Sequence, residues 1–438
     1  MRLLLGIFLR LVIIIPAVIL AGIIVHVASE RVQPDENMHL DAFAFFQTHW
    51  TRPEPDSDEV YYSPMGWSRV YTGEMVYLLY GKIGAAVLHF WPDTNLTQLY
   101  RFMNVALLLV TLTALTFVRC AWFPPWLLAL FLVCIPQVPY IYAYANSDAF
   151  GISASVLLFL ITAKMIEIEP RKWGVSRLIC FSILLLCTLL SKIDFLAAII
   201  LPLALLIFHL ARTQTSLPFV FTRLIVPLLA IYIFAAWWNP QLSPWHAKWD
   251  QQMTEMKEDH AIAGRRPTGP HDRNYYMASE GVDYGQMMHL YDSMWLKRTG
   301  QSFYSRFGGW RVQHPAWIFV VAGWIGVAGL LITLAAQLVF RQNMPWETMI
   351  CLLLSPGLIA LSVFGSMYQS LHIDYQPQGR YLFGALVPIF FLFAGTWKIE
   401  NRWWRTVHAT LFGALFALSI YSLWVFGAIE PRLRDMAY

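Results

Sequence analysis

The chain has 438 residues, of which 58% are apolar, 16% are aromatic and only 13% are charged. Soluble domains carry about 25% charged residues, so most of this chain must have lipid rather than water as its solvent. The formal net charge is only +4, and Lys and Arg are dispersed rather than gathered in blocks. This pattern excludes a nucleic-acid-binding surface.

Apolar runs long enough to cross ~30 Å of hydrocarbon recur along the chain. They predict an all-α polytopic membrane protein with about eleven transmembrane helices. The first run follows Arg2, and we interpret it as a retained span because no small-residue cleavage site follows it. The predicted spans are 4–27, 100–118, 124–144, 149–168, 176–191, 194–211, 219–238, 315–340, 346–367, 381–397 and 407–427.

A further apolar stretch, 71–91, carries charged residues, and the loop charges decide where it lies. If it does not cross and the N-terminus is cytoplasmic, most Lys and Arg residues of the short loops face the cytoplasm, as the positive-inside rule requires. If it crossed, most of those cations would face outward. We therefore predict an interfacial helix at 71–91 and a single domain, 1–438, with two large outer segments. These are a first outer loop at 28–99 and an ordered outer cap at 239–314.

An acidic motif follows the first span, in the sequence Pro34-Asp-Glu-Asn-Met-His. Pro34 favours a helix start, which places Asp35 and Glu36 in a first turn where carboxylates suit the helix dipole. His39 lies four and three residues after them, so all three side chains share one face. One interpretation is a carboxylate base near the membrane surface, with a histidine or a bound cation beside it. The other is an ordinary acidic first turn in an exposed loop.

Two later connections on the outer side also carry polar groups. Asn146 and Asp148 lie between the third and fourth predicted spans, where they form either a helix cap with an acidic first turn or part of a site. Lys192 and Asp194 lie between the fifth and sixth spans. They are costly in hydrocarbon unless they are paired or face a polar cavity. A short loop solvated at the depth of the headgroups explains them equally well.

Two arginines precede later spans. Arg306 lies among aromatic residues and glycines, where it would hold a phosphate or snorkel from an aromatic belt. Arg380 lies at the outer start of a span, where the positive-inside rule gives no reason for a cation, so we favour phosphate binding by its forked donors. All these motifs fall on the outer side. They predict one shared cavity, which a lipid-linked phosphate would enter sideways from the bilayer.

An acidic pair in the first outer loop, an interfacial helix after it and many spans resemble the GT-C membrane glycosyltransferases. The chain is more closely similar to an uncharacterised family of bacterial membrane proteins grouped with these enzymes. One element, Phe307–Trp310, departs from that family's pattern by an extra glycine. The elements that carry the resemblance, in chain order, are Pro34–His39, Asn146–Ala149, Lys192, Phe307–Trp310 and Gln378–Tyr381.

The resemblance implies a GT-C-like fold and an inverting transfer, in which a sugar moves from a polyprenyl-phosphate donor to a lipid-linked glycan or another surface acceptor. Asp35 would be the base that deprotonates the acceptor hydroxyl. The implied site residues are the catalytic Asp35, Glu36 and His39, the donor-phosphate-binding Arg380, Lys192 and Arg306, and the acceptor- or cation-binding Asn146 and Asp148.

The implied partners are the polyprenyl-phosphate sugar donor, a glycan or lipid acceptor and the membrane lipids. No cofactor is required. A divalent cation stays an open alternative, although Asp-Glu-Asn-Met-His is not the His-Glu-x-x-His zinc motif. The resemblance also places the protein in the bacterial inner membrane, with its active site on the periplasmic or extracellular side.

Two other functions stay open. A transporter or flippase of lipid-linked glycans would place binding residues near mid-membrane, often between repeated halves. The spans here carry little central charge and show no repeat, which favours chemistry at the surface. A glycan polymerase or ligase would also carry arginines in a large outer loop, but the early acidic pair favours the GT-C interpretation.

Overall fold

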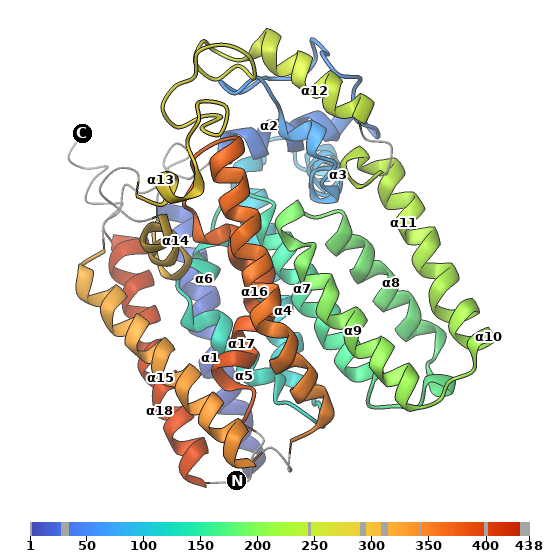
Figure 1. The fold of residues 1–438 in the computed structure, drawn as a ribbon, viewed down its shortest axis with the longest axis vertical. Coiled ribbons are helices and arrows are strands. Elements are labelled where there is room, and N and C mark those ends of the chain that lie inside the picture. Colours follow the sequence, from blue (N-terminus) through green and yellow to red (C-terminus); the bar gives the residue numbers. More distant parts are fainter. Residues whose placement is uncertain are drawn as a thin grey trace.

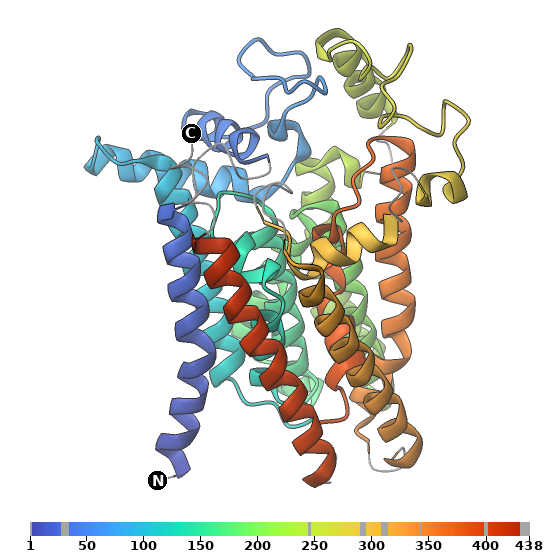
Figure 2. The ribbon, with the colours of Figure 1, turned by 90° about the vertical axis from the view of Figure 1, so that its left-hand side faces the viewer.

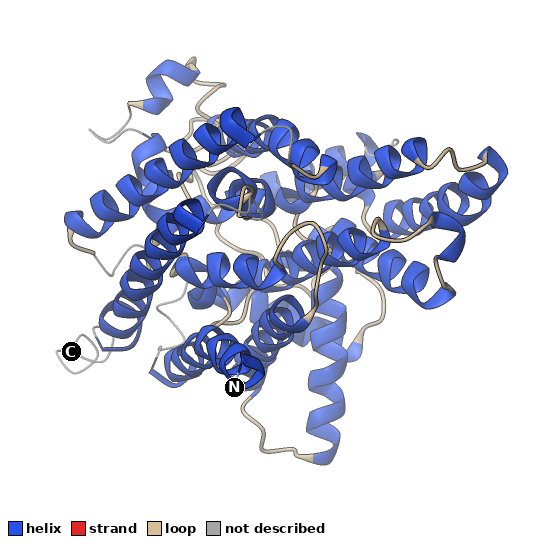
Figure 3. Cartoon of the chain, turned by 90° about the horizontal axis from the view of Figure 1, so that it is seen from below, coloured by secondary structure: helices blue, strands red, loops and turns tan. Residues whose placement is uncertain are grey.

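The structure is a computed structural model that describes residues 2–27, 35–243, 247–289, 295–307, 314–340, 344–397 and 402–429. These residues form helices joined by turns, with isolated β-bridges and no strand (Figure 3). The fold is therefore all-helical in the part of the chain that is described, as the composition predicts.

Eight helical stretches among the described residues are long and apolar enough to cross a membrane. They give the protein the architecture of a multi-pass membrane protein, and Figure 1 shows them as a bundle. The stretches are Arg10–Val27 within α1 (Arg2–Val27), α4 (Leu96–Phe117), α7 (Asp148–Met165), Ile193–Arg212 ending in α9 (Ala197–Arg212), Leu217–Trp238 ending in α11 (Val226–Trp238), α15 (Ala316–Phe340), α16 (Trp346–His372) and Arg402–Phe426 beginning with α18 (Arg402–Ser422).

The other three predicted spans correspond to shorter apolar helices. The predicted span 124–144 is broken after α5, because Pro136 disfavours a helical conformation at Ile135, which is extended. The predicted span 381–397 begins as a 3₁₀ helix, η9, before it becomes α-helical. The bounds are α5 (Pro125–Cys134) and α6 (Gln137–Ile141), α8 (Val175–Leu189), and η9 (Gly379–Ala385) followed by α17 (Leu386–Ala394).

The outer segments gather at the end of the bundle opposite the N-terminus, and α3 lies across that end in Figure 2. An antiparallel bridge joins Met65 of the first outer segment to Ala261 of the second, and another joins Tyr275 to Asp374 after α16. The helices of these segments are α2 (Glu36–Thr48), η1 (Arg69–Thr72), α3 (Met75–Phe90), α12 (Ala247–His260), α13 (Tyr284–Met288) and α14 (Trp295–Tyr304).

An aromatic cluster anchors α2 on the bundle. Phe43 is fully buried and packs against Tyr77 and Tyr80 of α3 and Tyr100 of α4, with a ring-centroid distance of 4.6 Å to Tyr100. Aromatic pairs at such distances contribute roughly 0.5–1.5 kcal/mol each beyond the area they bury. The helix that follows Asp35 therefore has a fixed position relative to the spans.

Candidate active site

Asp35 directly precedes α2 and has a left-handed backbone, with φ 58° and ψ 8°. Its carboxylate does not cap the helix and instead meets two arginines. Arg380 Nη2 donates to Asp35 Oδ2 at 2.8 Å, and Arg69 Nη2 lies 3.6 Å from the same oxygen. Both arginines are largely buried, whereas the Asp35 side chain is 37% exposed. Asp35 is therefore the member of this cluster that a ligand can reach.

Arg380 connects Asp35 to a second group of charges. Its Nη1 lies 3.8 Å from Asp148 Oδ2 at the start of α7. Asp148 Oδ1 also lies 3.3 Å from Lys192 Nζ, which is 3.2 Å from Asp194 Oδ2. Segments far apart in the sequence thus bring their charged residues into one cluster.

Close backbone packing holds η9 against this cluster. A Cβ atom on Gly384 would lie 2.2 Å from the carbonyl oxygen of Asp194, so only glycine lets η9 approach the turn that carries Lys192. The Lys192 ammonium also lies 4.3 Å from the ring centroid of Tyr381, within the range of a cation–π interaction. Arg380 and Lys192 are therefore fixed relative to each other.

The electrostatics keep Asp35 ionised. Burial alone would raise its pKa, but Arg380 and Arg69 outweigh that effect and hold the pKa of Asp35 well below its usual range. A carboxylate in this state is a weak base while both arginines remain bound to it.

Glu36 has partners other than those of Asp35 and forms a buried ion pair. Arg101 of α4 donates from Nε to Oε1 at 2.8 Å and from Nη2 to Oε2 at 2.6 Å. The backbone N–H of Ala145 also donates to Oε1 at 2.8 Å, and Arg101 Nη1 donates to the carbonyl of Val25 at 3.1 Å. Both oxygens of Glu36 are thus occupied by groups that join α2 to the bundle, an arrangement suited to positioning Asp35.

His39 is buried one turn into α2, with Nδ1 2.9 Å from the hydroxyl of Tyr77. Burial and the nearby Arg69 lower its pKa well below the ordinary value, although Asp35 opposes this shift. His39 is therefore neutral at pH 7 and can orient its neighbours by hydrogen bonding without adding charge.

Asn146 shapes the turn before α7. Its Nδ2 donates to the carbonyls of Ile141 at 2.6 Å and Tyr144 at 2.8 Å, and its Oδ1 accepts from the N–H of Ala149 at 3.0 Å. Asn146 thus takes the capping role that the sequence left open, and it places Asp148 in the first turn of α7 beside Lys192.

Arg306 lies just after α14, where its Nη2 donates to Gln301 Oε1 at 3.2 Å. Burial and the nearby Arg298 lower the pKa of Arg306 to about 10. The rest of the aromatic element, Gly308–Trp310, lies outside the described residues, as does Pro34 of the acidic motif.

An apolar groove of about 720 Å³ lies along α14. Gln301, which binds Arg306, lines it together with Lys297 and Phe303 of α14 and with residues of α5, α15, α17 and α18. A Cβ atom on Gly379 would lie 2.0 Å from the backbone nitrogen of Phe303, so the wall of the groove abuts the residue next to Arg380. The groove therefore passes beside the start of η9, although none of the charged residues of the cluster lines it.

Sequence reasoning missed Arg69, Arg101 and Tyr77, which contact Asp35, Glu36 and His39. No local pattern marks them, because each acts through a contact made only in the folded chain. Within the described residues, no group of three or more His, Cys, Asp or Glu side chains is placed to hold a metal ion.

Comparisons of the chain with protein-family models, with curated proteins and with solved structures found no match.

Proposed function

We propose that the protein is a GT-C-type glycosyltransferase that moves a sugar, with inversion, from a polyprenyl-phosphate donor to a lipid-linked glycan or another surface acceptor. The reaction would take place at the outer face of the bacterial inner membrane. The observation that carries this proposal is the Asp35–Arg380 pair, an accessible carboxylate bound to a buried guanidinium. The apolar groove next to η9 supports it, because a polyprenyl chain needs such a surface beside its phosphate.

In the proposed reaction an acceptor hydroxyl oxygen attacks the anomeric carbon of the donor, while Asp35 accepts the hydroxyl proton. The bond between the anomeric carbon and the phosphate oxygen breaks, and the polyprenyl phosphate leaves with the electron pair. Arg380 and Lys192 neutralise the charge that develops on that phosphate. Since a phosphate leaves with little need for a proton, a second carboxylic acid of the kind used by glycoside hydrolases is unnecessary.

The resting contact between Asp35 and Arg380 fits this sequence of events. The two non-bridging oxygens of the donor phosphate match the forked donors of a guanidinium as a carboxylate does, so the donor would compete with Asp35 for Arg380. As Arg380 turns to the phosphate, Asp35 regains affinity for a proton. Donor binding would thus activate the base just before the acceptor is deprotonated.

The proposal is tested by mass spectrometry of surface glycans and glycolipids from a host that lacks this gene. Complementation uses wild type, Asp35→Asn and the matched control Asp58→Asn, an exposed carboxylate of the same outer segment. We expect one sugar-sized mass to be lost in the deletion host and restored by wild type and by Asp58→Asn. Asp35→Asn should restore little, since losing a general base costs roughly 10²–10⁴-fold in rate.

Full restoration by Asp35→Asn would overturn the assignment of Asp35 as the base. A different contradiction would be the accumulation of complete, unaltered precursor glycans that fail to reach the surface. That result would favour a transporter of lipid-linked glycans.

A further inference from the structure

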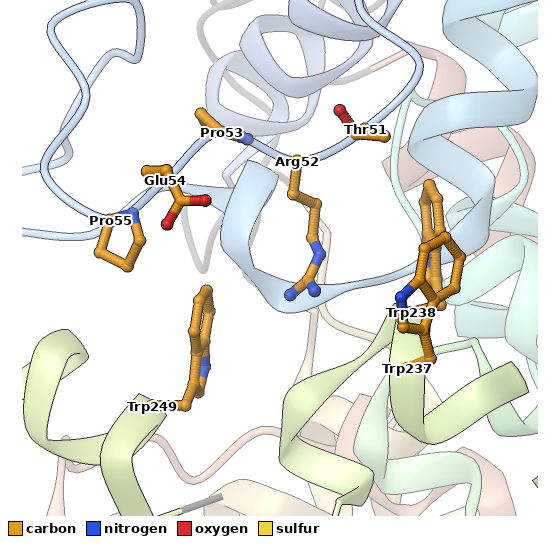
Figure 4. A pocket seen from close by; sticks show the side chains of 8 residues that line it. All are labelled: Thr51, Arg52, Pro53, Glu54, Pro55, Trp237, Trp238 and Trp249. Carbon is orange, nitrogen blue, oxygen red and sulfur yellow. The ribbon is translucent and has the colours of Figure 1, made fainter. Parts of the chain in front are cut away.

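A separate pocket of about 180 Å³ opens in the outer segments, between the chain just after α2, the end of α11 and α12 (Figure 4). Cavities of about 150 Å³ hold a benzene ring, so this one has room for a six-membered ring. None of the charged residues of the Asp35 cluster lines it. The lining residues are Thr51, Arg52, Pro53, Glu54, Pro55, Trp237, Trp238 and Trp249.

Three hydrogen-bond donors around this pocket are unused. Arg52 Nη1, Trp238 Nε1 and Trp249 Nε1 are buried, and none has a hydrogen-bond partner among the described residues. Figure 4 shows Arg52 between Trp249 on one side and Trp237 and Trp238 on the other. The guanidinium carbon lies 5.1 Å from the ring centroid of Trp249. Because buried polar groups are nearly always paired, three unpaired donors at one pocket indicate a ligand that brings acceptors.

The chemistry of the lining narrows the ligand class. The buried donors include a guanidinium, which favours an anionic group. Glu54, the carboxylate of the lining, is exposed to solvent and raises the pKa of Arg52 by its charge. The Trp249 ring presents its face to Arg52, and the indoles of Trp237 and Trp238 also line the pocket, so the lining suits a ring with apolar faces. Burial lowers the pKa of Arg52 to about 10, so the side chain still carries its charge at pH 7.

Tryptophan is common at the ends of membrane helices, where it anchors the helix in the interface. Trp237 fits that role, because it is 66% exposed. Trp238 does not, because only 7% of it is exposed and its N–H remains unpaired. An interfacial belt therefore accounts for one of these tryptophans and leaves the enclosed donors unexplained.

We propose that this pocket binds an acidic sugar unit, bearing a carboxylate or a phosphate, of the acceptor glycan. Naming this glycan as the acceptor rests on the proposed function, whereas binding of the sugar to the pocket does not.

The short helix η1 connects the pocket to the Asp35 cluster. Arg69 of η1 contacts Asp35, and Tyr71 of the same helix lies 6.2 Å from Trp249 between ring centroids. Since the two sites share no residue, an oligosaccharide rather than a single sugar is the ligand that would reach from one to the other.

The test measures binding of defined probes to the purified full chain in detergent by saturation-transfer NMR. The probes are a glucuronate-containing tetrasaccharide and a neutral glucose tetrasaccharide. The variants are Arg52→Met, Trp249→Phe and the control Arg265→Met, whose guanidinium also stacks on an aromatic ring, that of Tyr275 at 4.9 Å, away from the pocket.

We expect wild type and Arg265→Met to bind the acidic tetrasaccharide and not the neutral one. Arg52→Met should weaken binding at least about tenfold, because it removes a charge-assisted hydrogen bond. Trp249→Phe keeps a ring beneath Arg52 but loses one N–H, so it should weaken binding by a smaller factor. If Arg52→Met does not fold, the binding measured with Trp249→Phe still tests the proposal.

Equal binding of both tetrasaccharides by wild type, or unchanged binding by both pocket variants, would overturn the proposal. A phospholipid headgroup is the other source of the same anionic chemistry. If nanodiscs of phosphatidylglycerol abolish tetrasaccharide binding while nanodiscs of phosphatidylcholine do not, the pocket is a lipid headgroup site and the proposal fails.

Asp35→Asn separates this inference from the proposed function. The variant should lose transfer and keep tetrasaccharide binding if both are right. If it keeps transfer, the assignment of the base fails while the binding result still decides the role of the pocket.

Discussion

Asp35 combines a left-handed backbone, an exposed carboxylate and contacts with two arginines. Non-glycine residues in that conformation cost roughly 1–3 kcal/mol, and such strain persists where the surrounding structure holds it. Two ion pairs hold Asp35 in this conformation: the next residue, Glu36, pairs with Arg101, and the carboxylate of Asp35 pairs with Arg380. In this left-handed conformation the Asp35 carboxylate does not cap α2 and stays exposed to a ligand.

His39 predicts a pH dependence of folding stability. Its pKa is lowered in the folded protein by burial and by Arg69, whereas the unfolded chain titrates near 6.5. Below about pH 6.5 the unfolded state therefore binds more protons, so the free energy of unfolding falls as the pH falls. We expect His39→Asn to remove up to about 1.4 kcal/mol per pH unit of that decline. Chemical denaturation in detergent between pH 7 and pH 4.5 measures this pH dependence of the free energy of unfolding.

His89→Asn is the matched control for this measurement, because His89 is an exposed histidine on α3. Its unfolding curve should follow wild type at every pH. If the free energy of unfolding of His39→Asn falls with decreasing pH as steeply as that of wild type, His39 is not the group responsible.

At the scale of elements, α2 depends on the ion pair between Glu36 and Arg101. Both side chains are almost completely buried, so removing one partner leaves the other charge unpaired. We expect Glu36→Gln to lower the free energy of unfolding by about 3–5 kcal/mol. Asp41→Asn, a half-buried position on the same helix, should change it by less than ~0.5 kcal/mol. Denaturant titration of the purified protein gives both values.

The double variant Glu36→Leu with Arg101→Leu separates the contribution of the ion pair itself from the cost of leaving one buried charge unpaired. With neither charge left to bury, it should recover part of the lost stability, since apolar replacements of buried ion pairs are often neutral or stabilising. If the double variant is less stable than Glu36→Gln, the interaction contributes more than the cost of an unpaired charge.

At the scale of the whole molecule, the long spans could be predicted from the sequence because lipid selects on length and apolarity alone. The apolar run 124–144 does not predict the break after α5, because it continues past Pro136 and Pro139, the two prolines that mark the break. The count of about eleven spans stays a prediction, since eight described stretches meet the length and composition of a span.

The candidate site could be predicted from the sequence only in part. The position of Arg380 at an outer span end pointed to a special role, and the structure places it against Asp35. The helical spacing of the acidic motif predicts that Glu36 and Asp35 share one face. In the structure their side chains pair with different cations on different elements. Periodicity predicts which residues share a helix face, whereas the partner of each charge depends on packing between distant segments.

The groove and the charged cluster together predict how the whole molecule holds its donor. Gly326 lines the groove, and a Cβ atom built there meets no atom within 4 Å, so a side chain at this position has space to start from and would narrow the groove in Gly326→Leu. Gly357→Leu on α16 is the control, because it also has open space and lies outside the groove lining. We expect Gly326→Leu to lower kcat/KM for a long-chain polyprenyl-phosphate donor by roughly tenfold or more, since the apolar chain loses a surface worth about 25 cal/mol per Å².

A donor with a shortened chain separates recognition of the lipid from a general loss of folding. With such a donor, Gly326→Leu and wild type should have similar kcat/KM, because the blocked part of the groove is not used. If Gly326→Leu impairs both donors equally, or if Gly357→Leu impairs the long one as much, the groove does not hold the donor chain. The phosphate would then have to reach Arg380 by another route.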